Sequence, residues 1–154
     1  MDAKVSWHGR MSFTGSADSG FDVPLGTVPA VGGDNDGFRP LELMGVSLAG
    51  CTAMDVISIL TKMRQEVTRF DVMVHTDRAD NHPKVFTKAV ITYMIVGHNI
   101  DEKSVARAIE LSASIYCPAQ NMLKNAFPTS LLYEIYEGDG EENTELINKG
   151  EVVI

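Results

Sequence analysis

The sequence is poor in cysteine and in positive charge. Its 154 residues include two cysteines, one tryptophan and 13 lysines and arginines, against 21 aspartates and glutamates. The net charge of −8 argues against nucleic acid or an anionic membrane as a partner, because both need a basic surface. Two cysteines cannot form an all-cysteine zinc site, which needs four thiolates.

Several recognisable segments are also missing. The first ten residues, MDAKVSWHGR, lack the apolar stretch of a signal peptide, so we expect a cytoplasmic location, where permanent disulfides are rare. The glycine-rich segment 26–37 is followed by no Lys-Ser/Thr pair, and no G-x-S-x-G motif occurs. His75 and His82 flank a loop that contains aspartate, but nothing in the sequence shows that they converge. We therefore expect neither a cofactor nor a metal.

The hydrophobic pattern predicts one α+β domain over residues 1–154, with 138–154 as a loosely packed tail. The last residues, EVVI, are either a short strand or part of that tail. The predicted elements are a hairpin over 3–14, an edge strand over 21–25, a loop over 26–38, a helix over 40–65, strands over 70–76 and 85–97, helices over 102–114 and 118–126, and a strand over 131–137. Asp101 is the expected N-cap of the helix that follows it. This order differs from the alternating pattern of a doubly wound parallel sheet.

The helix over 40–65 is apolar for most of its length. From Leu41 to Leu60 only Glu42 and Asp55 are charged, so the segment is long enough to raise the question of a membrane span. Two acids, several hydroxyl residues and the lack of a second such segment favour a buried central helix. Because it is apolar on nearly all sides, a sheet or a partner must cover it. Its small residues permit close approach to a second helix: Gly45, Ala49, Gly50 and Ala53.

Cys117 and Cys51 lie in different chemical settings. Cys117 directly precedes Pro118, at or near the N-cap of a helix, where unpaired N–H groups and the helix dipole lower the pKa of a thiol. A small buried side chain is the alternative role. Cys51 lies in the middle of the apolar helix, where burial disfavours the thiolate. Glu42 lies nine residues earlier, half a turn out of phase, and reaches Cys51 only from a bent segment or a second subunit.

The run PLELMGVSLAGCTAMDVISIL, followed by YCPAQNML, resembles the OsmC/Ohr family. The similarity covers residues 3–137, and it is specific because both cysteine contexts and their spacing agree. It implies an OsmC-like fold of antiparallel sheets packed on a central cysteine helix, in an intertwined homodimer with sites at the subunit interface. It also implies a thiol peroxidase that acts on organic hydroperoxides or hydrogen peroxide, with Cys51 as the peroxidatic and Cys117 as the resolving cysteine.

Two positions depart from the pattern of the characterised peroxidases. An arginine in the N-terminal strands supplies a cation to the first cysteine in those proteins, but Ala17 lies near that place here, and no basic residue occurs between Arg10 and Arg39. The family acid is displaced by one position, to Glu42. Both departures resemble a less characterised branch of the family with the same Cys-x-Ala-x-Asp-Val run. Arg39 is the best substitute cation, and we expect Arg39 and Glu42 to support Cys51 across the dimer.

Three functions remain open from the sequence. The first is the peroxidase, in which Cys51 forms a sulfenic acid, Cys117 traps it as a disulfide and a dithiol reductant restores both thiols. The second is a non-catalytic protein of the same fold, whose cysteines line a pocket for a small apolar ligand. The third is another thiol reaction of the same cysteines, such as disulfide or persulfide reduction.

Overall fold

The computed structural model describes residues 1–140 and 144–154. The chain folds as two compact units, Met1–Met44 and Gly45–Ile154. The first unit holds a three-stranded antiparallel sheet with β1 (Ala3–Gly9), β2 (Ser12–Ala17) and β3 (Asp22–Leu25) in that order. The predicted hairpin and short edge strand are therefore confirmed. The loop that follows contains one short 3-10 turn, η1 (Pro29–Val31).

Helix α1 (Pro40–Lys62) begins at a proline, whose fixed φ suits the first turn of a helix. Its buried side chains recur every fourth residue and form a single stripe: Leu48, Thr52, Val56 and Leu60. Other faces are open, since Val46 is 56% and Met54 is 73% exposed. A sheet covers only one side of a helix, so the predicted cover is found on the buried stripe, and cover of the open faces by a partner stays a prediction.

Length and composition alone would let α1 cross a membrane, with a mean hydropathy of 1.8, and it is the one such helix in the described residues. A helix that packs on a sheet within its own chain passes the same test, so this evidence is weak. From Gly45 onward, the buried stripe of α1 contributes to the core of the second unit.

The second unit is built on a four-stranded sheet in the order β4 (Glu66–Arg78), β5 (Phe86–His98), β6 (Thr129–Glu137) and β7 (Glu145–Val152). The outer pairs are antiparallel, but β5 and β6 run parallel. The expectation of purely antiparallel sheets is therefore corrected. The cause is the helical segment between β5 and β6, which carries the chain back across the sheet before the next strand begins.

Strand β7 lies within the segment 138–154, for which a loose tail was one prediction. From Glu145 to Val152 the chain pairs with β6, so this part is an ordered edge strand. Residues 141–143 of that segment lie outside the described residues.

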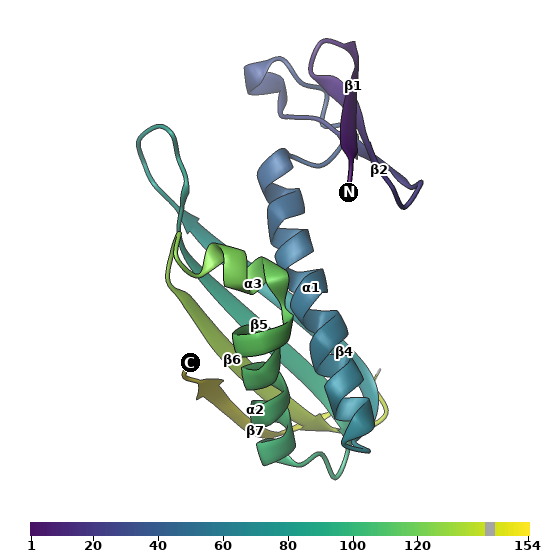
Figure 1. Ribbon diagram of the computed structural model, residues 1–154, viewed down its shortest axis with the longest axis vertical. Coiled ribbons are helices and arrows are strands. Elements are labelled where there is room, and N and C mark those ends of the chain that lie inside the picture. Colours follow the sequence, from purple (N-terminus) through teal and green to yellow (C-terminus); the bar gives the residue numbers. More distant parts are fainter. Residues whose placement is uncertain (141–143) are drawn as a thin grey trace. The chain divides into compact units, whose positions relative to one another are not determined.

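The helical connection contains α2 (Glu102–Leu111), a π-helical turn η2 (Ser112–Tyr116) and α3 (Pro118–Leu123). Asp101 caps α2 as predicted, because its carboxylate accepts a hydrogen bond from the N–H of Ser104 at 2.9 Å. Figure 1 shows α1 and α2 side by side across one face of the four-stranded sheet. Between helices and sheet lies the hydrophobic core, which includes Val56, Leu60, Ile91, Tyr93, Ile95, Val105, Ile109, Leu131 and Ile135.

Candidate active site

Cys117 lies between the π-helical turn and α3, as the N-cap of α3. Its backbone N–H donates to the carbonyl of Ser112 at 2.8 Å, and its Sγ accepts a hydrogen bond from the N–H of Gln120 at 3.4 Å. The side chain is fully buried. The predicted position at a helix N-terminus is confirmed, and the proline that follows fixes the backbone for the first turn of α3.

The predicted effect of that position on acidity is wrong. The pKa of Cys117 is raised to about 12, and burial is the largest cause. The hydrogen bond from Gln120 lowers the pKa, but by less, and the neighbouring Cys51 thiol raises it further. Burial outweighs the helix terminus because removing a thiolate from water costs more than the N–H groups of Gln120 and Ala119 return. Cys117 is therefore a protonated thiol at neutral pH.

Cys51 lies on α1 directly before the buried Thr52 and is partly exposed. Its thiol is close enough to that of Cys117 to contribute to the raised pKa of Cys117. Both cysteines are free. The structure thus brings together two thiols that are 66 positions apart in the sequence, one fully buried and one that solvent reaches.

Glu42 and Arg39 form a pair of their own at the start of α1. The guanidinium of Arg39 binds one carboxylate oxygen of Glu42, and the Arg39 N–H donates to the other at 3.0 Å. These contacts lower the pKa of Glu42, with the backbone hydrogen bond as the largest cause. Both side chains are about half exposed. The pair belongs to the first unit and Cys51 to the second, so support of Cys51 by this pair stays a prediction.

A network of polar side chains, all buried except the partly buried Asp55, includes neighbours of both cysteines in the chain, and sequence reasoning missed it. Thr52 Oγ1 lies 2.7 Å from Tyr93 Oη and 2.9 Å from Ser112 Oγ. Ser112 Oγ donates to Asp55 Oδ2 at 3.2 Å, and Gln120 Nε2 donates to Tyr93 Oη at 3.3 Å. Burial raises the pKa of Tyr93 to about 12, so its hydroxyl keeps its proton. A threonine in the buried stripe of α1 was the available signal.

The family model for OsmC-like protein matches residues 33–131, a segment that includes both cysteines, Glu42 and Arg39. The chain belongs to the OsmC-like family. This OsmC-like chain is 33% identical to Protein YhfA of Escherichia coli strain K12 over 138 residues, which cover 88% of the chain and 98% of YhfA.

Solved structures show the same fold as this OsmC-like chain. A hypothetical protein from Aquifex aeolicus VF5 has a TM-score of 0.78 at 26% identity, with 89% of this chain and 96% of that one covered. An organic hydroperoxide resistance protein from Elizabethkingia anophelis, crystallised with thiocyanate, has a TM-score of 0.63 at 14% identity. That match covers 88% of this chain and 94% of the other. The expected α+β OsmC-like fold is therefore confirmed.

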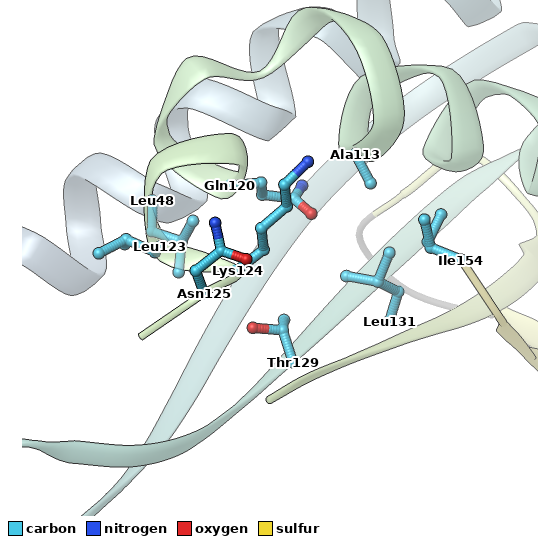
Figure 2. Close-up of a pocket in the computed structure, with 9 residues that line it drawn as sticks. All are labelled: Leu48, Ala113, Gln120, Leu123, Lys124, Asn125, Thr129, Leu131 and Ile154. Carbon is cyan, nitrogen blue, oxygen red and sulfur yellow. The ribbon is translucent and has the colours of Figure 1, made fainter. Parts of the chain in front are cut away.

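The second unit of the OsmC-like chain also contains a pocket of about 300 Å³ (Figure 2). It is lined by Leu48, Ala113, Gln120, Leu123, Lys124, Asn125, Thr129, Leu131 and Ile154. Neither cysteine is among these described lining residues, unlike the cysteine-lined pocket that the sequence allowed. Gln120 links the pocket to the cysteine pair, since its side chain lines the pocket and its backbone N–H donates to Cys117 Sγ.

Proposed function

We propose that this OsmC-like protein is a thiol peroxidase that reduces organic hydroperoxides or hydrogen peroxide. The observation that best supports this proposal is the difference between two neighbouring thiols. Cys51 is partly exposed, whereas Cys117 is fully buried and has a raised pKa. A peroxide in solution can reach the first thiol, while the second stays protonated until a partner forms beside it. The hydroperoxide resistance named for the relative of the same fold agrees with this chemistry.

The proposed reaction has two balanced steps. The Cys51 thiolate attacks the outer peroxide oxygen; the O–O bond breaks, the alkoxide takes a proton to leave as an alcohol, and Cys51 becomes a sulfenic acid. The Cys117 sulfur then attacks the Cys51 sulfur, an S–S bond forms, and the hydroxyl leaves as water with the Cys117 proton. An external dithiol reductant, present in a reducing cytoplasm, converts the disulfide back to two thiols.

Glu42 and Arg39 have a supporting role in this proposal. Their ion pair keeps the carboxylate ionised and places one positive group at the start of the cysteine helix. Arg39→Ala should slow peroxide consumption, and Arg39→Lys, which keeps the charge but loses the fork-shaped hydrogen bonding, should slow it less. Equal rates for the wild type and Arg39→Ala would remove Arg39 from the proposal.

We also infer that two copies assemble as a homodimer through the open face of α1. Met54 is 73% exposed on this apolar helix, and a Cβ added at Gly50 would meet no atom within 4 Å. Apolar side chains beside small residues suit close packing against a second helix. Met54→Glu should shift the mass in sedimentation equilibrium from dimer to monomer. Lys103→Gln, which makes the same change in net charge at an exposed position of α2, should not. A wild type that sediments as a monomer would contradict the inference.

One experiment tests the peroxidase directly. The reduced protein is mixed with one equivalent of cumene hydroperoxide, and peroxide loss, free thiols and peptide masses are followed together. We expect one hydroperoxide consumed per Cys51–Cys117 disulfide. Cys51→Ser should consume none, whereas Cys117→Ser should consume one and leave a sulfenic acid that dimedone traps. Peroxide consumption by Cys51→Ser at the wild-type rate, or a wild type that stays reduced, would refute the peroxidase.

The pocket beside Gln120 supports a second candidate function, the binding of a small apolar ligand. Five of its nine lining residues are aliphatic, and four are polar: Gln120, Lys124, Asn125 and Thr129. Pockets of this size and composition accommodate small molecules. Two results together would favour this function: the protein binds a fluorescent apolar probe and Leu131→Trp abolishes that binding, and hydroperoxide leaves both cysteines reduced. Disulfide formation with no probe binding would favour the peroxidase.

A further inference from the structure

The buried polar network has a single direction of hydrogen bonding. A carboxylate only accepts, so the Ser112 hydroxyl donates its hydrogen bond to Asp55. At the other end an amide nitrogen only donates, so Tyr93 Oη accepts from Gln120. The Tyr93 hydroxyl must then donate to Thr52, and the Thr52 hydroxyl to Ser112. The donor and acceptor roles of each hydroxyl in this network are therefore fixed by its neighbours.

This network connects the two segments that hold the cysteines. Thr52 follows Cys51 on α1, while Gln120 lies in the first turn of α3, whose N-cap is Cys117. Tyr93, which is fully buried on β5, joins the two segments through its single hydroxyl. Hydrogen bonds in a buried row reinforce one another, and a missing member leaves its neighbours unsatisfied out of reach of water. The backbones of α1 and α3 are thus tied to a common point on the sheet.

We propose that Tyr93 and Thr52 are positioning residues that set the distance between the Cys51 and Cys117 sulfurs. Neither residue touches the peroxide; each acts through the segment that bears a cysteine. In the peroxidase, their effect falls on the second step, in which Cys117 attacks the sulfenic acid of Cys51, and that part of the inference rests on the proposed function. The other part, that these two residues set how easily the Cys51–Cys117 disulfide forms, does not depend on the proposed function.

The test of the distance uses a glutathione redox buffer and no peroxide. In this equilibrium two glutathione thiols reduce the Cys51–Cys117 disulfide and leave one glutathione disulfide. Tyr93→Phe removes only the hydroxyl that joins the two segments. We expect it to lower the equilibrium constant for the protein disulfide on the order of tenfold, or roughly 30 mV, because effective concentration falls steeply when two groups move apart.

The chain offers a matched control for this variant. Tyr133 is also buried, pairs with Tyr93 across β5 and β6, and donates its hydroxyl hydrogen bond to Glu102 at 2.6 Å, outside the network. Tyr133→Phe therefore loses a comparable bond and should leave the disulfide equilibrium unchanged. Thr52→Val, which keeps the side-chain shape, should act like Tyr93→Phe, whereas Thr52→Ser, which keeps the hydroxyl, should act like the wild type. Thermal melting of each variant verifies that it is folded.

The second measurement follows the oxidation of the two cysteines in excess hydroperoxide. Tyr93→Phe should lose its first thiol at the wild-type rate but accumulate more sulfinic acid at Cys51, because the slower second step leaves the sulfenic acid exposed to further oxidation. If Tyr93→Phe and Tyr133→Phe match in the glutathione buffer, the positioning role is refuted. If the glutathione shift is found but no variant consumes peroxide, the positioning role stands and the peroxidase fails.

Discussion

The acidity of Cys117 leads to a quantitative prediction about its reactivity. In Cys51→Ser, where Cys117 is the remaining cysteine, the folded protein should react slowly with a neutral aromatic disulfide such as 4,4′-dithiodipyridine. Burial is the largest cause of the pKa of about 12 and is kept in the variant, while the smaller contribution of the Cys51 thiol is lost. The side chain is also fully buried, which further slows attack on any reagent.

The expected rate follows from two opposing effects. At pH 7 a thiol of pKa about 12 is ~10⁻⁵ thiolate, against ~3% for a free thiol of pKa ~8.5, which is a ~3,000-fold deficit. A more basic thiolate is a better nucleophile, and a Brønsted coefficient of ~0.45 over ~3.5 pKa units returns ~40-fold. The net reduction is ~80-fold for the wild-type pKa and less for the variant, which lacks the Cys51 contribution, before steric exclusion is counted.

The assay is stopped-flow absorbance of the released thiopyridone, with the same variant in urea as the control. Unfolding should restore the rate of a free cysteine. A folded-state rate within fivefold of the unfolded rate would show that the helix terminus outweighs burial. The assignment of Cys117 as the protonated, second-acting thiol would then be wrong.

Three further predictions concern stability. Leu60→Ala should lower the free energy of unfolding by ~2–5 kcal/mol in urea titration, because the side chain is fully buried and leaves a cavity. His98 forms a hydrogen bond with Glu137 at 2.9 Å, and this bond is the main cause of its raised pKa. The contribution of His98 to the free energy of unfolding is therefore complete below its unfolded pKa and is lost as the pH rises through its folded pKa. His98→Gln should therefore destabilise the protein more near pH 5.5 than near pH 9, and equal losses would exclude this linkage. Gly97→Ala should cost ~1–3 kcal/mol, since its Cβ would overlap the Glu66 carbonyl oxygen; an unchanged melting temperature would contradict this packing.

Sequence patterns succeeded where the determinants are local. The hairpin of β1 and β2, the cap at Asp101 and the place of Cys117 before α3 each depend on a few adjacent residues. The cysteine contexts also indicated the family, which the match over residues 33–131 confirms. Such features follow from turn chemistry, capping and periodicity, all of which act within one or two turns of chain.

Non-local features were missed or misjudged. The parallel pairing of β5 with β6 depends on the path of the intervening helices, and the strand in the segment after residue 138 depends on an edge that β6 provides. Tyr93 looks like an ordinary core residue of β5, and Thr52 marks a polar position in the stripe of α1 without indicating its partner. Their hydroxyl contact joins positions 41 residues apart, and no local pattern specifies it.

The sequence by itself determined that the chain has two thiols and that one of them stands at a helix N-terminus. Only the tertiary structure decided how acidic that residue is. A helix terminus is a property of neighbouring residues, whereas burial depends on every segment that packs around the thiol. Here the core around Cys117 raises its pKa to about 12, and the partly exposed Cys51 lies beside it. The folded environment therefore overturns the lowered pKa that local electrostatics predicted for Cys117, because desolvation exceeds the pull of a few N–H groups.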